Sequence, residues 1–461
     1  MWEALERIRA ATAHTPYEGR VYLVGGVLRD RVLGLPPAQD VDLVVEEDAV
    51  ALAHLLRSKG VAERRPTVYP RFGTAMVSVA GVQVEFVTAR AERYGAGSRK
   101  PTVRRATLRD DVLRRDFTIN TLLENLHSAE LLDLTGRALA DLREGVIRTP
   151  LAPEETFHDD PLRMLRAVRF AARLGFRVEE RAWQAIEQMA GRLNLMGPAS
   201  PVVSAERIRD EVLKTLLSPD PAGGMEMLRR SGLLRQFWPE LQAMVGVAQN
   251  AWHSHDVWDH TMLALRSLAL DAGQTVRLAV LLHDVGKPAT RSEDPRGVHF
   301  YEHQFVGADM ARVLLQRLRL PNDEVREVTT LVALHMRLGE MRSEWSDAAV
   351  RRLIRDTSAH LGALFLVARA DTAAMSPAAP VTDLDAVRAR IEAVNREADA
   401  ARMASPLDGN EIMVALGVAP GPVVGEAKEM LVNEVIEGRL RDGDKAGALD
   451  RLRAWSAARG A

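Results

Sequence analysis

Short apolar runs separated by glycine-bearing turns recur through the first 150 residues of this 461-residue chain. Runs of this kind, rich in valine and bounded by turn residues, are typical of buried β-strands. We therefore expect residues 1–150 to combine a small sheet with helices. The runs are VYLVGG at 21–26, VDLVVE at 41–46, TAMVSVA at 74–80 and VQVEFVTA at 82–89.

The pattern becomes helical from about Thr156 and stays mostly helical to the C-terminus. Segments such as DPLRMLRAVRFAARLGF and AERIRDEVLKTLL place apolar residues three and four positions apart, which is typical of amphipathic helices. The stretches MGPASPVVS (196–204) and SPAAPVTD (376–383) predict breaks between helices. These changes predict four domains, at residues 1–150, 151–250, 251–375 and 376–461.

Composition excludes several classes of protein. Hydrophobic residues make up 47% of the chain and charged residues 27%, as in ordinary globular proteins. No stretch approaches the roughly 20 apolar residues of a membrane span, and the acidic N-terminal segment does not resemble a signal peptide. The absence of cysteine excludes disulfides and thiolate metal sites, and it favours a cytoplasmic location.

Positive charge is concentrated in one part of the chain. The net charge is only −2, yet residues 51–115 hold 14 Lys and Arg against 5 Asp and Glu. Such a cluster suits an RNA backbone or a polyphosphate. A basic face that contacts only solvent is the alternative.

Two carboxylates, Asp40 and Asp42, stand at the start of a predicted strand. Because strand side chains alternate between faces, both carboxylates point to the same side. Such a pair can hold Mg²⁺, which phosphoryl transfer requires. Upstream, the motif GGVLRD offers Gly25 and Gly26 for close approach to a triphosphate and Arg29 to balance its charge.

The motif RRDFTIN supplies further candidate ligands for a nucleotide. Arg114 and Arg115 would place positive charge where pyrophosphate leaves. Asp116 and Asn120 lie four apart, on one face of a predicted helical turn, and could hydrogen-bond a ribose. Glu85, in VQVEFV, is a candidate third acid beside the metal ions.

Asp160 and Arg163 lie three apart at the start of a predicted helix and so project together. A carboxylate accepts from an exocyclic amino group, and a guanidinium donates to an unprotonated ring nitrogen. Cytosine and adenine present this pair of groups, whereas guanine and uracil present a carbonyl and a protonated nitrogen. The pair therefore predicts a protein template for C and A, worth about 1–3 kcal/mol of discrimination. A helix-start acid with an i+3 salt bridge is the alternative.

Five ordered motifs between residues 21 and 214 resemble those of the class II tRNA nucleotidyltransferases. This CCA-adding family includes bacterial poly(A) polymerases. The family's base-reading motif usually opens with Glu-Asp, whereas here it opens with Asp159-Asp160. The motifs are GGVLRD with the following DVD, RRDFTIN, LLDLTGRALADL, DDPLRMLRAVRFAARLGF and ERIRDEVLK.

The resemblance implies an α+β fold with a polymerase-β-like nucleotidyltransferase head and an all-α neck, body and tail. It places the Mg²⁺-binding catalytic acids at Asp40 and Asp42, the base-reading pair at Asp160 and Arg163, and a ribose contact at Asp116. CTP and ATP would be the substrates, with a tRNA acceptor arm held by the helical tail.

Other residues of the helical neck have less specific predictions. Arg163, Arg166, Arg169 and Arg173 form a basic stripe that would track RNA. Arg166 and Arg169 are also candidate nucleotide-binding residues. Arg207 and Glu211 fall in the family's last motif and are expected to support the structure.

The sequence leaves the product open. The segment at 90–113 corresponds to a flexible loop that enables the final A to be added, and it is short here. Relatives that add only CC resemble the full enzymes with this loop shortened. CCA, CC alone, A alone and poly(A) therefore remain alternatives, and the oligomeric state is undetermined.

A second constellation lies in a histidine-rich helical block from Trp252 to about Ala374. Imidazoles and carboxylates mixed in this order suit a divalent transition-metal ion, which would activate water for hydrolysis. Trp252 and Trp258 are expected in the core. The candidate ligands are His260, His283, Asp284 and Asp371, with His303 and His335 as further possibilities, and His253, His255, Asp256 and His299 lie nearby in the sequence.

This block resembles the HD phosphohydrolase domain found behind the transferase module in some bacterial relatives. The resemblance implies hydrolysis of phosphomonoesters or 2′,3′-cyclic phosphates at RNA 3′ ends, with Mg²⁺, Mn²⁺ or Ni²⁺ as cofactor. A degenerate domain kept for packing or RNA binding is one alternative. Another is an HD hydrolase whose head only binds RNA.

Overall fold

A computed structural model describes residues 1–36, 40–93, 102–196, 201–249, 252–295, 297–341, 344–357, 359–397, 405–441 and 443–459. Contacts divide the chain into two compact units, Met1–Ala243 with Leu314–Pro321, and Met244–Val313 with Asn322–Ala461. None of the described helices is both long and apolar enough to cross a membrane.

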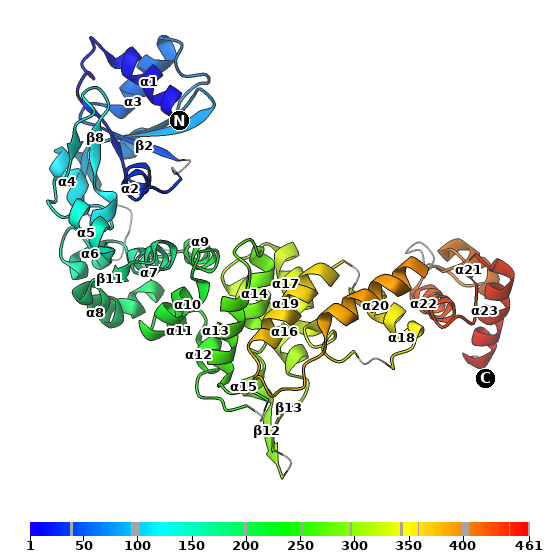
Figure 1. The fold of residues 1–461 in the computed structure, drawn as a ribbon. Coiled ribbons are helices and arrows are strands. Elements are labelled where there is room, and N and C mark those ends of the chain that lie inside the picture. The colour runs from blue at the N-terminus through cyan, green and yellow to red at the C-terminus, as the bar shows by residue number, and fades with distance from the viewer. Residues whose placement is uncertain are drawn as a thin grey trace. The chain divides into compact units, whose positions relative to one another are not determined.

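The first unit begins with a seven-stranded sheet of order β3-β4-β5-β2-β1-β8-β9. Its strands β2 and β8 are labelled in the blue to cyan part of the ribbon (Figure 1). Strands β2 and β5 run parallel, and the other neighbours are antiparallel. The four predicted runs form β1, β2, β4 and β5. The strands are β1 (Val21–Val24), β2 (Val41–Val45), β3 (Thr67–Tyr69), β4 (Thr74–Val79), β5 (Val82–Thr88), β8 (Leu123–Asn125) and β9 (Leu131–Leu132), with the pairs β6 (Arg90–Arg93) and β7 (Thr102–Arg105), and β10 (Val146–Ile147) and β11 (Arg177–Val178), outside this sheet.

The two faces of this sheet are covered differently. On one face, helix α3 (Ala49–Ser58) packs on β4 and β5, whose Val84 and Phe86 are fully buried. On the other face, Val112 of α4 (Leu108–Leu113) packs in one cluster with Val44 and Leu123. Because Asp42 and Val44 are two residues apart, Asp42 lies on the α4 face.

Helices make up the rest of the first unit. The long helix α7 packs against α9 and α10, and α6 packs against α8. The returning segment Leu314–Pro321 joins this unit, where the indole of Trp238 donates to the Leu314 carbonyl at 3.0 Å. The remaining helices are α1 (Trp2–Thr12), α2 (Gly26–Val32), α5 (Ala138–Glu144), α6 (Pro153–Asp159), α7 (Leu162–Leu174), α8 (Glu180–Met189), α9 (Ala205–Leu216), α10 (Pro221–Arg230), α11 (Leu234–Phe237) and α12 (Pro239–Gln242), with 3₁₀ turns at Pro70–Phe72, Thr118–Asn120 and Ala190–Asn194.

The second unit is helical apart from one described hairpin. Helices α13, α14, α17 and α19 pack on one another, and α21, α22 and α23 enclose a separate cluster around Leu431 and Leu452. The elements are α13 (Val257–Ser267), α14 (Gln274–Leu282), α15 (Lys287–Thr290), β12 (Arg291–Asp294), β13 (Gly297–Phe300), α16 (His303–Arg317), α17 (Asn322–Leu334), α18 (Asp347–Thr357), α19 (Leu361–Ala373), α20 (Leu384–Glu397), α21 (Gly409–Leu416), α22 (Pro422–Ile436) and α23 (Lys445–Arg459).

The predicted α+β class with a helical C-terminal region is confirmed. One local expectation is wrong. The sequence predicts Asp116 and Asn120 on one face of a helical turn, but α4 ends at Leu113 and, within RRDFTIN, Thr118–Asn120 form a 3₁₀ turn that excludes Asp116. The two side chains still meet, since Asn120 donates to Asp116 at 3.1 Å.

Candidate active sites

Three carboxylates gather on the open part of the α4 face. Asp40 is exposed and directly precedes β2, Asp42 lies within β2, and Glu85 is the residue paired with Asp42 across the parallel β2–β5 register. Burial raises the pKa of Asp42, with Arg115 lowering it and Asp40 raising it further. Burial and then the neighbouring Asp42 raise the pKa of Glu85. These raised pKa values indicate a site short of positive charge, which a cation would supply.

A glycine turn lies beside these acids. Val24, at the end of β1, pairs with Asp42, so the next residue, Gly25, lies next to the Asp42 carboxylate. Gly25 has φ +81°, a conformation that other residues rarely adopt, and α2 begins at Gly26. The backbone at Gly25 therefore approaches the Asp42 carboxylate closely, and the predicted approach to a triphosphate stays a prediction.

Arg29 occupies a different position from the one predicted. Its guanidinium is buried, pairs with Asp30 at 2.6 Å and donates to Asn120 Oδ1 at 2.9 Å. Burial lowers its pKa despite the attraction of Asp30. This placement argues against direct contact with a triphosphate, and it gives Arg29 a role in fixing Asn120.

Asp116 is the centre of a buried network. It accepts hydrogen bonds from Asn120 at 3.1 Å and from Arg166 Nε at 2.9 Å. Burial raises the pKa of Asp116, but Arg166 and Asn120 outweigh burial and hold it well below its usual range. Glu211 pairs with Arg169 at 2.5 Å and lies 3.6 Å from Arg166. Asp116 is thus fixed to α7 as a carboxylate.

This network corrects one interpretation of the sequence. Arg169 is buried with Glu211, so the predicted RNA-tracking stripe of arginines is wrong at that position. Arg166 is committed to Asp116 and Glu211. Arg166 positions Asp116 directly, and Arg169 holds Glu211, the other acid near Arg166.

The two arginines of RRDFTIN share a buried anchor that the sequence analysis missed. Asp111 accepts from Arg114 Nε at 3.0 Å and from Arg115 at 3.0 Å. Its own pKa is lowered, since the two arginines outweigh the effect of burial. The capping box of α4, formed by Thr107 and Asp110, fixes the turn that carries Asp111.

The predicted base-reading residues lie where α6 ends and α7 begins. The Asp160 carboxylate accepts from Arg207 of α9 at 2.9 Å and from the Leu162 amide at 3.1 Å. Arg163 donates to the Arg114 carbonyl at 2.6 Å. Both are half-buried, and Arg207 is an orienting partner that sequence spacing alone did not reveal.

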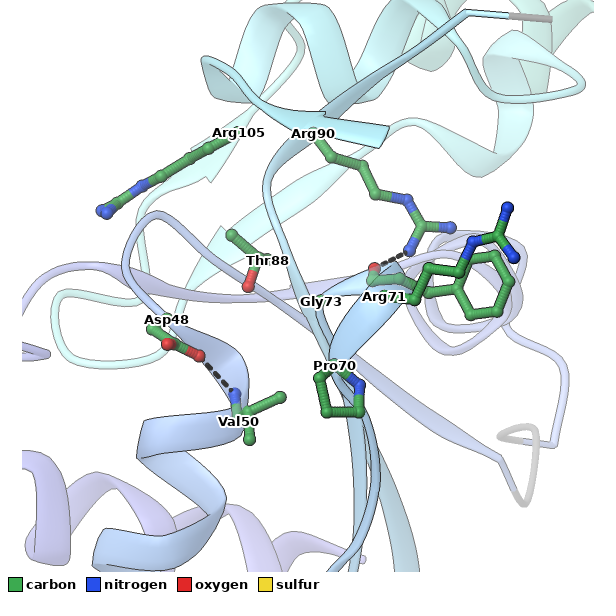
Figure 2. A pocket seen from close by; sticks show the side chains of 9 residues that line it. Asp48, Val50, Pro70, Arg71, Gly73, Thr88, Arg90 and Arg105 are labelled. Carbon is green, nitrogen blue, oxygen red and sulfur yellow. Dashed lines mark hydrogen bonds between the residues drawn. The ribbon is translucent and has the colours of Figure 1, made fainter. Parts of the chain in front are cut away.

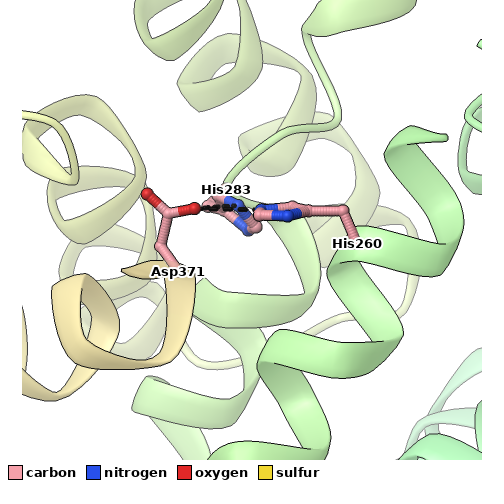
Figure 3. A group of neighbouring side chains, drawn as sticks. All are labelled: His260, His283 and Asp371. Carbon is pink, nitrogen blue, oxygen red and sulfur yellow. Dashed lines mark hydrogen bonds and ion pairs between the residues drawn. The ribbon is translucent and has the colours of Figure 1, made fainter. Parts of the chain in front are cut away.

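In the second unit, six metal-ligating side chains form two adjacent triads. His260, His283 and Asp371 make up one triad (Figure 3), and the ligand atoms of Asp284, His303 and His335 make up the other. His260 Nε2 lies 2.9 Å from Asp371 Oδ1, and His283 Nε2 lies 3.1 Å from Asp284 Oδ2. Both predicted sets of ligands therefore come together, from three helices (α13, α16 and α19) and from the turns that follow α14 and α17.

Two buried atoms of this cluster lack well-directed hydrogen bonds within the described residues, namely His283 Nε2 and Asp284 Oδ1. Leaving such atoms unpaired costs about 1–3 kcal/mol each. Their imidazole and carboxylate donors fit a divalent transition metal. His253 meets the His260 ring edge to face, and its pKa is lowered to about 4, chiefly by burial. His299 pairs with Asp294 in the hairpin.

Comparison with known proteins now adds to this geometry. The chain is 33% identical over 444 residues to an A-adding tRNA nucleotidyltransferase of Deinococcus radiodurans, covering 94% of this chain and 95% of that protein. It is also 33% identical over 443 residues to a CC-adding tRNA nucleotidyltransferase of Thermus thermophilus, covering 94% and 93%. The chain belongs to the tRNA nucleotidyltransferase family.

Family models match separate parts of this nucleotidyltransferase. A poly A polymerase head domain matches residues 21–148, the model described as "Probable RNA and SrmB- binding site of polymerase A" matches 175–244, and an HD domain matches 253–382. The fold resembles that of the Bacillus stearothermophilus CCA-adding enzyme solved with CTP, with TM-score 0.70 and 23% identity over 99% of this chain and 98% of that one.

The HD motif of this nucleotidyltransferase contains one residue that the sequence analysis did not select. Lys287 is buried and donates to Asp284 at 2.6 Å and to Gln249 at 2.7 Å. Gly286 precedes it, and a Cβ there would lie 2.3 Å from the His303 carbonyl. The spacing HDVGK was the available signal, because it puts a cation three residues after the metal-binding acid.

A pocket of about 350 Å³ opens onto the HD cluster, with Asp371 and His335 in its wall. Trp252 also lines this pocket and is 46% exposed, so its expected place in the core is wrong. Trp258 is 1% exposed, which confirms the expectation for that residue. The other lining residues are mixed, with Met336 and Met375 apolar and Glu340 and Thr372 polar.

Proposed function

We propose that this chain transfers cytidylyl and adenylyl groups, or one of the two, from CTP and ATP to the 3′ end of tRNA. The observation that carries the proposal is the set of carboxylates Asp40, Asp42 and Glu85 beside the Gly25 turn. Oxygen donors of this kind suit Mg²⁺, which would stabilise the charge that develops on the transferred phosphate. Arg115, held by Asp111, adds fixed positive charge nearby.

Base selection would rest on Asp160 and Arg163. Arg207 and the Leu162 amide orient the Asp160 carboxylate, which would accept from an exocyclic amino group of the base. The Arg163 side chain is fixed through the Arg114 carbonyl. The base would therefore be selected next to Arg114, whose neighbour Arg115 lies close to Asp42.

The test uses three tRNA transcripts, ending before CCA, after C and after CC. CTP and ATP are supplied separately and together, and the products are sized to the nucleotide. Wild-type protein is expected to extend at least one transcript, and Asp42→Asn to extend none. Long A tails would instead identify a poly(A) polymerase. No incorporation on any transcript would refute the proposal.

Addition of only part of the CCA sequence is a second candidate. Two relatives of equal identity carry the names A-adding and CC-adding, and the loop segment is short. Residues 94–101 of that segment lie outside the described residues. Arrest at CC would identify a CC-adding enzyme, whereas extension of only the third transcript, by one A, would identify an A-adding enzyme.

We also propose that the HD cluster hydrolyses phosphate esters at RNA 3′ ends. A divalent metal held by the two triads would lower the pKa of bound water and supply hydroxide. Lys287 neutralises Asp284 and places a cation beside the site. The adjoining pocket of about 350 Å³, with Trp252 in its wall, has room for a nucleoside.

This second activity is tested with RNA ending in a 2′,3′-cyclic phosphate or a 3′-phosphate, in the presence of Mg²⁺, Mn²⁺ or Ni²⁺. Hydrolysis by wild type and by Asp42→Asn, but not by His283→Ala, would support the HD site. If wild type, Asp42→Asn and His283→Ala all fail to hydrolyse either RNA, the HD domain is degenerate.

A further inference from the structure

A second pocket lies in the head, beyond the carboxyl ends of β2 and β5. Its volume is about 340 Å³. Three arginines and one carboxylate are among the residues that line it, with Arg71 and Arg90 on one side and Arg105 on the other (Figure 2). The carboxylate, Asp48, is occupied by the amides of Val50 and Ala51, which it caps at the start of α3.

Arg71 is presented on a rigid turn. It is exposed, it lies in the 3₁₀ turn Pro70–Phe72, and no described carboxylate forms an ion pair with it. A backbone hydrogen bond fixes the end of this turn, because the Gly73 carbonyl accepts from the Thr88 amide at 2.9 Å. Gly73 has φ +59°, so a side chain there would be strained.

Arg90 connects this pocket to the acids of the transferase site. Its guanidinium donates to the Phe72 carbonyl at 2.5 Å and to Thr74 Oγ1 at 3.2 Å. Thr74 pairs with Val87, so its side chain lies on the same face as Glu85. Arg90 is close enough to Glu85 to counteract the rise that burial causes in the pKa of that acid.

The position of the pocket separates it from the expected triphosphate. Gly25 follows β1, on one side of β2, whereas the pocket adjoins β4 and β5 on the other side. Thr88 lies three residues beyond Glu85, which is about 10 Å along the strand. A group bound in the pocket is therefore distinct from the reacting phosphate.

We propose that this pocket binds a backbone phosphodiester of the RNA strand whose 3′ end lies at Asp42 and Glu85. The inference rests on the proposed transfer to RNA. Arg105 is paired with Glu47. The guanidinium groups of Arg71 and Arg90 both line the pocket, and a phosphate that accepts from both would relieve their mutual repulsion. Arginine suits this role because its planar fork matches phosphate oxygens.

The test measures binding of a fluorescently labelled tRNA transcript lacking CCA to the full chain over a series of salt concentrations. Arg71→Ala is expected to weaken binding about tenfold and to reduce the slope of log K against log salt by about 0.7. Arg71→Lys should keep the slope and lose only part of the affinity. The matched control is Arg65→Ala, an exposed arginine outside the pocket, which should change neither.

Three results would overturn the inference. One is an unchanged affinity in Arg71→Ala, and another is an equal loss in Arg71→Ala and Arg65→Ala. The third is a raised KM for CTP or ATP with unchanged RNA binding, which would assign the pocket to a phosphate of the free nucleotide. Wild-type extension of tRNA alongside any of these leaves the proposed transfer intact. If wild type neither binds nor extends tRNA, both proposals fail.

Discussion

The two candidate sites use carboxylates under opposite electrostatic conditions. In the head, burial and neighbouring acids raise the pKa values of Asp42 and Glu85. In the HD cluster, the pKa values of Asp284 and Asp371 are lowered well below the usual range, because histidine and lysine partners outweigh burial. The head site therefore requires an added cation. In the HD cluster, histidine and lysine side chains already balance much of the negative charge.

This difference predicts opposite consequences for stability. Repulsion among the head acids destabilises the fold until a ligand binds, as is common where function and stability conflict. The buried His–Asp pairs of the HD cluster instead stabilise the fold, provided that both partners are present. Removing one carboxylate from each site tests the comparison.

The largest effect is expected for Asp42→Asn. Nucleotide incorporation should fall about 10³-fold or more, because the metal site and its charge are lost. The free energy of unfolding should stay equal or rise, since a repelled carboxylate is removed. Asp284→Asn in the HD cluster should lower the free energy of unfolding. Incorporation assays and urea unfolding measure these changes, and equal destabilisation by both variants would contradict the comparison.

Glu211 is a buried carboxylate that we expect to support the fold rather than catalysis. Glu211→Ala should destabilise the first unit by about 3 kcal/mol, because Arg169 would be left buried without its partner. The double variant Glu211→Leu with Arg169→Met should recover most of this loss. Urea unfolding gives both values. A double variant as unstable as the single one would argue against the unpaired charge as the cause.

The HD cluster also predicts a dependence on pH in chelator-treated protein. Asp284 and Asp371 raise the pKa of His283 to about 10, outweighing the lowering by burial. A raised pKa in the folded state means that the stabilisation is fully present below about pH 6.5 and is lost as the pH rises towards 10.

Urea unfolding at pH 6.5 and pH 10 measures this dependence. His283→Gln should show a smaller loss between the two pH values, and His299→Gln, outside the cluster, should behave as wild type. An equal loss in His283→Gln and wild type would show that other groups cause it.

The smallest effect is expected for Arg207→Ala. Loss of the charged hydrogen bond to Asp160 should lower kcat/KM for CTP and ATP about tenfold and reduce discrimination against UTP and GTP. Arg209→Ala, on the same helix, is the control, because Arg209 contacts Asp210 and the Arg319 carbonyl instead. Steady-state kinetics with each nucleotide measure these changes. Equal losses of kcat/KM for all four nucleotides would show that Arg207 has a merely structural role.

The sequence predicted what depends on local periodicity and short spacing. The strands that carry Asp42 and Glu85 and the ordered HD ligands were all recognisable. The register that pairs Asp42 with Glu85 was not, because it depends on how β2 and β5 associate. Long-range partners were missed for the same reason, including Asp160 with Arg207 and Arg169 with Glu211. Spacing places the arginines of α7 on helix faces but does not tell which face is buried.

The segment Leu314–Pro321 bears on how the chain folds during synthesis. It belongs to the first unit, although the ribosome adds roughly 80 residues between Ala243 and the end of this segment, which takes about 4–16 s. Until then Trp238 lacks its carbonyl partner and Glu240 lacks Arg317. The head and neck are thus completed only after most of the HD ligands have left the ribosome, and shortening the chain at residue 243 would remove part of the first unit.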